Sequence, residues 1–380
     1  MPPWMAGRRG AFMHMIAAAV SLTACSLGSM LTSSTSRAGS YTVIVVGKER
    51  LTSTPGISEY PTGWSPDGNQ IAFTGFLGRL GMEDVYLGIL TLRDGQEAKS
   101  EKLLDSAAKE YGGYWSPDGK KIAFFSNRGG NYDVWVLNAD GSGPAQLTTD
   151  AADDLYPTWS PDGKKMAFLS SRSGEVAIWT MNNDGSDQAQ ITAGGNGDWG
   201  TDWSPDGKKI LFGSVRMSSL NEGKLTKDEA LAESELLKSF FETVLLAGIP
   251  SENIWTVDLE TRRLHQLTTT ATARQARLEK RLERVAAQAD APVPIESVRH
   301  WHPVWSPDGK KIAYVSDVVG TPDLWVMDAD GSNPVRLTSD AGDESFPEWS
   351  PDGMRIAYAA SSDYSSNADI WVLTLRRARQ

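Results

Sequence analysis

A five-residue sequence, Trp-Ser-Pro-Asp-Gly, occurs six times in this chain and constrains its fold more than any other feature. Its tryptophan stands at Trp64, Trp115, Trp159, Trp203, Trp305 and Trp349. The successive spacings are 51, 44, 44, 102 and 44 residues. A period near 44 residues with several short strands per unit is typical of a β-propeller, in which each unit forms one four-stranded blade.

Each repeat predicts the same four strands. Ser-Pro-Asp-Gly suits a type I turn between two antiparallel strands, because proline fixes one φ angle and glycine accepts a positive one. An apolar second strand begins seven residues beyond each tryptophan, as at Ile122. Third strands carry an aromatic residue at Tyr86, Trp135, Trp179, Trp255, Trp325 and Trp371. Fourth strands end at Leu103, Leu147, Ile191, Leu267 and Leu337.

The two ends of the chain are expected to share one blade. The sixth unit stops after its third strand, whereas Leu51-Thr52 resembles the end of a fourth strand that has no unit of its own. Pairing the two would close the ring and remove exposed sheet edges. We therefore predict an all-β fold: a monomeric, six-bladed β-propeller formed by residues 41–380.

The 102-residue spacing contains two insertions, at about 217–249 and 269–299, and both are predicted to be helical. In the first, Thr226 and Glu229 have capping-box spacing. The second has an apolar face that includes Leu278 and Leu282. In an up-and-down blade both connections emerge at the same end, so two helices are expected on one face. They either pack on each other and cover blade edges, or form a lid or docking surface.

The repeats resemble those of the TolB family, because they match in the tryptophan, Ser-Pro-Asp-Gly, Asp-x-Trp and Leu-Thr positions. The resemblance covers about residues 41–380. Proteins of the full TolB type place an additional α/β domain before the propeller. We expect this domain to be missing here, since only a short segment precedes residue 41.

Residues 1–40 are typical of an export signal followed by a tether. Arg8 and Arg9 precede an apolar run, which predicts a signal peptide over 1–24. Leu22-Thr23-Ala24-Cys25 resembles the lipobox of bacterial lipoproteins, which implies that Cys25, the only cysteine, carries lipid. Residues 25–40 then form a flexible tether to a bacterial membrane, on the periplasmic side or the cell surface. The alternative is ordinary cleavage nearby, with Cys25 left as an unused thiol.

One position of the repeat is acidic in five of the six units. Five residues before each repeated tryptophan stand Glu59, Glu110, Asp154, Asp198, His300 and Glu344. These six are called the ring residues below. They are predicted to surround the mouth of the central channel, on the same face as the insertions, and to attract a cation or basic ligand. Alternatively, each acid caps its own loop. Arg128, Arg172 and Arg216 follow their second strands and are expected to pair with acids such as Asp133.

Composition and motifs favour binding over catalysis. The net charge of -11 argues against a nucleic-acid partner. The sequence contains no Gly-x-Ser-x-Gly, phosphate-binding glycine loop or His-Glu-x-x-His motif. We therefore expect an envelope protein that binds a protein, peptide or glycan, without a cofactor or metal. Two alternatives remain: a metal site at His300 and His302, and a lyase or glycan hydrolase whose active site lies in the channel.

Overall fold

The computed structural model describes residues 41–77, 84–93, 96–104, 106–193, 198–214, 252–268, 299–340, 342–361 and 367–379. These residues form six four-stranded antiparallel sheets and contain no helix. The prediction of an all-β, six-bladed propeller is therefore confirmed. The two helical insertions lie outside the described residues apart from Arg299, as do the signal peptide and the tether.

In each blade the first strand contacts the first strands of neighbouring blades and so lies innermost. The first strands are β2 (Ile57–Trp64), β6 (Glu110–Trp115), β10 (Asp154–Trp159), β14 (Asp198–Trp203), β18 (His300–Trp305) and β22 (Glu344–Trp349). The second strands are β3 (Gln70–Leu77), β7 (Lys121–Ser126), β11 (Lys165–Ser170), β15 (Lys209–Ser214), β19 (Lys311–Ser316) and β23 (Arg355–Ala360).

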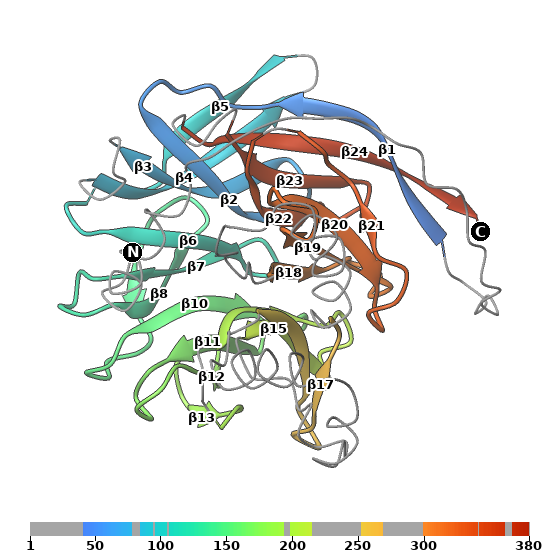
Figure 1. Ribbon diagram of the computed structural model, residues 1–380. Coiled ribbons are helices and arrows are strands. Elements are labelled where there is room, and N and C mark those ends of the chain that lie inside the picture. The colour runs from blue at the N-terminus through green and yellow to red at the C-terminus, as the bar shows by residue number, and fades with distance from the viewer. Residues whose placement is uncertain are drawn as a thin grey trace, which may run out of the picture. The chain divides into compact units, whose positions relative to one another are not determined.

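Third and fourth strands complete the blades in the predicted order (Figure 1). The third strands are β4 (Asp84–Arg93), β8 (Asp133–Asn138), β12 (Ala177–Asn182), β16 (Asn253–Asp258), β20 (Asp323–Asp328) and β24 (Asp369–Arg379). The fourth strands are β5 (Gln96–Lys102), β9 (Ala145–Gln146), β13 (Ala189–Gln190), β17 (Leu264–Gln266), β21 (Val335–Arg336) and β1 (Tyr41–Arg50).

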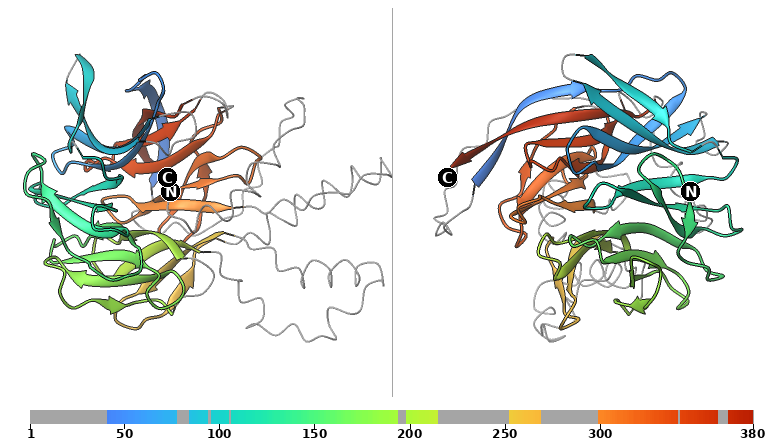
Figure 2. Two further views of the ribbon diagram at one scale, coloured as in Figure 1. Left: turned by 90° about the vertical axis from the view of Figure 1, so that its left-hand side faces the viewer. Right: turned by 180° about the vertical axis from the view of Figure 1, so that it is seen from behind.

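The closing blade joins the two ends of the chain, as predicted. Its sheet order is β1-β24-β23-β22, and the blue β1 lies beside the red β24 in Figures 1 and 2. The Leu51 N–H donates to the Ile370 carbonyl at 2.8 Å, just as the Leu147 N–H donates to the Val134 carbonyl at 2.8 Å. Residues Ile44–Arg376 form one compact unit, which contains every site described below. The described residues of a second unit, 41–43 and 377–379, include a contact between the Arg377 guanidinium and the Tyr41 ring.

The repeated motif forms the predicted turn. In the third blade the Gly163 N–H donates to the Ser160 carbonyl at 2.8 Å, and Gly163 has a φ angle of 68°. The Ser160 hydroxyl donates to the Asp162 carboxylate at 2.7 Å, and that carboxylate accepts the Lys164 N–H at 3.1 Å. The motif therefore satisfies its own polar groups, which explains why one sequence recurs at every such turn.

The hydrophobic core lies between neighbouring blades. Ala72, Leu87 and Ile89 of the first blade pack against Phe124 and Leu137 of the second. The second strands are buried on both faces, which matches their continuous apolar sequence. Another cluster extends from Val85 of the first blade to Trp203 of the fourth, so neighbouring interfaces share their packing.

Candidate functional site: the ring residues and the propeller axis

The ring residues lie inside the blades. Five of them are the first residue of an innermost strand, and Glu59 is the third residue of β2. The five acids are 1% exposed or less, and His300 is 7% exposed. Asp154 and Asp198 accept hydrogen bonds from side chains, namely those of Arg172, Thr192 and Ser214. The role of the ring residues as ligand contacts stays a prediction.

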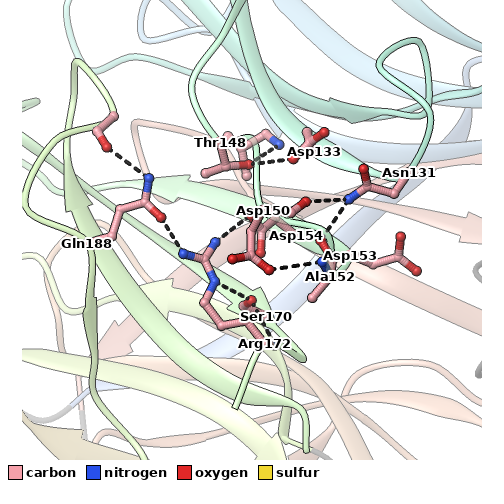
Figure 3. A network of polar contacts seen from close by, with 12 residues as sticks. Asn131, Asp133, Thr148, Asp150, Ala152, Asp153, Asp154, Ser170, Arg172 and Gln188 are labelled. Carbon is pink, nitrogen blue, oxygen red and sulfur yellow. Dashed lines mark hydrogen bonds and ion pairs between the residues drawn. The ribbon is translucent and has the colours of Figure 1, made fainter. Parts of the chain in front are cut away.

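Two of the acids form ion pairs with the arginines that follow the second strands. Arg172 pairs with Asp154 at 2.6 Å, and its Nε donates to the Ser170 hydroxyl at 2.9 Å (Figure 3). Arg128 pairs with Glu110 in the same way. The prediction that these arginines pair with acids is confirmed, but the prediction that Asp133 is a partner is wrong. That carboxylate accepts hydrogen bonds from Gln146 and Thr148 instead. Arg216 lies outside the described residues.

Threonine hydroxyls tie each blade to the next. Thr192, which follows β13, accepts the Ile178 N–H at 3.0 Å and donates to Asp198 in the next blade at 2.7 Å. Asp198 also accepts a hydrogen bond from Ser214 at 2.8 Å. The same threonine position accepts a third-strand N–H in four other blades, at Thr52, Thr148, Thr268 and Thr338. Thr52, Thr148 and Thr338 also act on the ring acid of the next blade, which is Glu59, Asp154 and Glu344 respectively, so this contact between blades is repeated.

Glu344 differs from the other ring acids. Within the described residues its carboxyl oxygens form no hydrogen bond of normal geometry, although the Thr338 hydroxyl lies close enough to lower its pKa. Burial raises its pKa to about 8, the charges of Asp323 and Asp340 raise it further, and Thr338 and Lys48 act weakly in the opposite direction. At neutral pH the carboxyl group is therefore mostly protonated.

A bulge in the first strand separates the ring residues from the side chains that reach the axis. In β10 two residues, Tyr156 and Pro157, oppose Phe168 alone, and Tyr156 has a φ angle of 51°. His302 and Phe346 occupy the same position with φ angles of 48° and 53°. A bulge shifts the alternation of a strand by one residue. Residues four apart, which a regular strand would place on one side, therefore lie on different sides.

The residues just before the repeated tryptophans converge at the axis. Glu348 of the sixth blade is influenced by the charge of Asp202 in the fourth blade, and Tyr114 of the second blade is influenced by Glu348. Residues of alternate blades can come this close only at the centre of the ring. Tyr114, Tyr156, Asp202, His302 and Glu348 are called the axial cluster. All five are partly exposed to solvent although protein surrounds them.

The axial cluster contains two carboxyl groups with raised pKa values. Burial raises the pKa of Asp202 to about 7, although its Oδ2 accepts the Trp305 N–H at 2.7 Å. Burial also raises the pKa of Glu348 well above its usual value, and the charge of Asp202 adds to this effect. At neutral pH the pair is therefore only partly ionised, and a cation at the axis would favour its ionised form.

Aromatic rings continue around the axis. The His302 ring stacks on Phe346 with centroids 3.8 Å apart and meets the Trp199 edge at 5.3 Å. Phe346 contacts Tyr60, and a chain of ring contacts continues to Tyr156. Burial lowers the pKa of His302 to about 3, and its Nδ1 accepts the Phe346 N–H at 3.4 Å. His302 is therefore a neutral part of this aromatic lining.

The bulge also directs the two histidines of β18 to different surroundings. His300 lies edge-on to Tyr314, with ring centroids 5.8 Å apart, whereas His302 packs between Trp199 and Phe346. In the part of the chain that the structure describes, no group of three or more His, Cys, Asp or Glu side chains could hold a metal ion. Within the same residues no helix has the length and hydrophobicity needed to cross a membrane.

Sequence reasoning missed the axial acids because it assumed a regular first strand. Gly112 and Gly200 occupy the bulge with positive φ angles, and glycine at this position is a sequence signal for it. Three other blades have Tyr156, His302 and Phe346 there, and bulky residues rarely adopt this conformation, so their sequences do not indicate a bulge. With the bulge placed, the residue before each tryptophan becomes the position to inspect, and only Asp202 and Glu348 are acidic among Gly63, Tyr114, Thr158, Asp202, Val304 and Glu348.

Comparison with known proteins agrees with the fold and the repeat. The family model of the TolB β-propeller domain matches residues 62–244. This part of the chain is therefore similar to a TolB β-propeller domain. A Tol-Pal system protein TolB from Anaeromyxobacter dehalogenans is 36% identical over 94 residues, which are 25% of this chain and 20% of that protein. An uncharacterized protein of Agrobacterium fabrum is 32% identical over 104 residues, 27% of this chain and 33% of its own length.

Solved structures show the same fold at lower identity. TolB from Acinetobacter baumannii superposes with a TM-score of 0.52 at 19% identity, covering 86% of this chain and 67% of that one. The tricorn protease gives a TM-score of 0.53 at 15% identity, covering 85% of this chain and 26% of the protease. TolB-like propellers and a protease therefore share this scaffold, so the function has to be inferred from the site.

Proposed function

We propose that this protein is a non-catalytic binding protein of the bacterial cell envelope, whose axial cluster receives a basic side chain from a protein partner. The convergence of Asp202 and Glu348 carries the proposal. Two carboxyl groups from alternate blades lie close enough to influence one another in a partly exposed place at the axis. A lysine, an arginine or a terminal amine between them would stabilise their ionised forms.

The surroundings of the acids suit an extended peptide. Tyr114 and Tyr156 offer hydroxyl groups, and the His302, Phe346 and Trp199 rings offer apolar and aromatic faces. Aromatic side chains provide large contact areas at low entropic cost and attract cations above their rings. A few acids within an aromatic lining therefore favour one basic side chain flanked by apolar residues.

The assignment to the cell envelope rests on two supports. The curated relatives with the matching repeat are named Tol-Pal system protein TolB, and this chain spans 20% of the length of the relative cited above. The sequence also predicts a signal peptide and a lipid on Cys25. Both supports favour an exported, lipid-anchored protein that binds another envelope protein; a glycan is the alternative ligand.

Site-specific photocrosslinking tests the proposal. A photoreactive phenylalanine analogue replaces Tyr114 at the axis or, as a control, Val335 on the outer strand β21, which is 38% exposed. We expect an envelope protein to be crosslinked from position 114 only. The yield should fall roughly tenfold when Asp202→Asn and Glu348→Gln are added, because the charged contacts are lost. An unchanged yield in that double variant would contradict the proposal.

This double variant is a sharper probe than neutralising the ring acids. Asparagine at position 202 can still accept the Trp305 N–H, so the fold is expected to persist. By contrast, neutralising Asp154 would leave the partly buried Arg172 without its partner. Loss of binding in a ring variant would therefore not distinguish a lost ligand contact from a disturbed blade.

The axial acids also favour a second candidate, a glycan hydrolase or lyase. Two neighbouring carboxyl groups whose pKa values are both raised by burial can supply an acid and a base. Turnover of envelope glycans by the purified protein, lost in Asp202→Asn and Glu348→Gln single variants, would favour this candidate. Crosslinking to a protein without any turnover would favour the binding function.

A further inference from the structure

Two blades contain a built-in site for a guanidinium group. In the third blade the Arg172 guanidinium lies 4.9 Å from the Trp179 ring and 5.6 Å from the Phe168 ring, and it pairs with Asp154 at 2.6 Å. In the second blade Arg128 lies 5.0 Å from Trp135 and 5.3 Å from Phe124, and it pairs with Glu110. A ring acid, a second-strand aromatic residue and a third-strand tryptophan thus enclose each cation.

The closing blade has the same three walls without the arginine. Glu344 is its ring acid, Tyr358 its second-strand aromatic residue and Trp371 its third-strand tryptophan. Eighteen residues beyond Glu110 and Asp154 stand Arg128 and Arg172, whereas the same count from Glu344 reaches a serine, which lies outside the described residues. Glu344 is 1% exposed and forms no ion pair within the described residues, although the Thr338 hydroxyl acts on it as a hydrogen-bond donor.

A cavity of about 490 Å³ adjoins this acid. Glu344, Trp371 and Asn367 line it, together with two cations from β1 that already pair with other acids. Lys48 pairs with Asp340, and its ammonium lies 4.7 Å from the Trp371 ring and 5.9 Å from the Tyr358 ring. Arg50 pairs with Asp369 at 2.6 Å. Among the described residues, no cation is therefore paired with Glu344.

We propose that this cavity binds a guanidinium group, supplied either by a free small molecule or by an arginine side chain of a peptide. The group would pair with Glu344 and lie over Trp371, as Arg172 pairs with Asp154 and lies over Trp179. A planar guanidinium can donate two parallel hydrogen bonds to a carboxylate while it stacks on an aromatic face, which an ammonium cannot do. The cavity volume is within the range of small-ligand sites.

Binding should release a proton. Glu344 faces Asp323, Asp340, Lys48 and Tyr358, and burial with the two aspartate charges raises its pKa to about 8. The carboxyl group is therefore mostly protonated at pH 7 when the cavity is empty. A guanidinium ligand requires the carboxylate, so its affinity should rise from pH 6 to pH 8.5.

Calorimetric titration of the whole mature protein with ethylguanidinium tests the site. Ionic strength is held constant with tetramethylammonium chloride, and N-ethylurea serves as the neutral analogue. We expect binding of ethylguanidinium only. Glu344→Gln should weaken it roughly tenfold or more, since a hydrogen-bonded charge pair is lost. Glu49→Gln, at an exposed position of β1, should leave it unchanged.

Two further measurements distinguish an arginine side chain from a small molecule and test for proton release. A Gly-Arg-Gly peptide that binds at least tenfold more tightly than ethylguanidinium assigns the site to an arginine side chain; tighter binding of free arginine assigns it to a small molecule. Titrations at pH 7 in buffers of different ionisation enthalpy should report proton release that Glu344→Gln abolishes. The proposal is overturned if Glu344→Gln leaves the affinity for ethylguanidinium unchanged, or if none of the three guanidinium probes binds. The axial double variant should bind as the unmodified protein does, so this outcome is separate from the proposed function.

Discussion

The third blade and the closing blade place an acid at the same ring position but complete it differently. Asp154 is fully buried and paired with Arg172, which is 15% exposed and held by Ser170 and Gln188 (Figure 3). Glu344 is equally buried but has no such partner, and a cavity lies beside it. The fold is the same in both blades, so the arginine is not required to form one.

The difference between these two blades indicates how a repeated fold can acquire a ligand site. Six copies of one blade provide six similar ring positions, and a filled position stabilises the blade that holds it. The closing blade lacks this arginine, and a cavity lies beside its ring acid. Departures from local consistency of this kind are expected at functional sites.

Removing the cation from the filled site should have the largest effect. Arg172→Ala leaves the buried Asp154 carboxylate without its partner, so we expect the free energy of unfolding to fall by about 3–5 kcal/mol. Urea denaturation at pH 7 measures it. Adding Asp154→Asn to the same chain should restore part of the loss, because the unpaired charge is removed. A loss below about 1 kcal/mol would show that the two blades do not differ in the way described.

Removing the acids should separate the two blades directly. Asp154→Asn leaves Arg172 partly buried and unpaired, and should cost about 2 kcal/mol. Glu344→Gln replaces a protonated carboxyl group with an amide of the same shape, and at pH 6 should raise stability by about 2 kcal/mol, because only the glutamate releases its proton on unfolding. Parallel urea denaturation of both variants at pH 6 makes the comparison. Equal losses would mean that Glu344 is as well paired as Asp154.

Local sequence signals were enough to predict most of the fold. Trp-Ser-Pro-Asp-Gly forms a turn that satisfies its own hydrogen bonds, so its six occurrences fix six blades. The Leu51-Thr52 pair correctly indicated closure, because Leu51 makes the same backbone contact as Leu147. Both features depend on residues close together in the sequence or on exact repetition, which a single chain displays.

The sites were harder to predict because they depend on geometry that the repeat conceals. The ring position was found, but its burial was not, since a bulge at Tyr156, His302 and Phe346 turns the strand. The axial acids Asp202 and Glu348 were missed for the same reason. The missing arginine of the closing blade was readable from the eighteen-residue count, but only after the pairing of Arg172 with Asp154 gave that count a meaning.

The pH dependence of stability should reveal the unpaired acid. The pKa of Glu344 is about 8 in the folded protein and has an ordinary value of 4.5. The folded state therefore holds this proton more tightly, and its contribution to stability is present below pH 4.5 and is lost as the pH rises toward 8. Relative to the unmodified protein, Glu344→Gln should gain about 4 kcal/mol between pH 5 and pH 9. A difference between the two proteins that stays constant with pH would contradict a raised pKa.

Lys48 should contribute least to stability yet influence the proposed site. Its ion pair with Asp340 is exposed, with side-chain exposures of 31% and 54%, so Lys48→Ala should cost no more than about 0.5 kcal/mol. Its ammonium lies over the Trp371 ring, where the ligand would stack. Removing it should therefore strengthen ethylguanidinium binding severalfold in calorimetric titration. Lys99→Ala, which removes the exposed pair with Glu101 on β5, is the matched control and should leave affinity unchanged. Weaker binding in Lys48→Ala would instead make Lys48 part of the ligand's own contacts, and the closing blade would then hold its cation in a different place from the third.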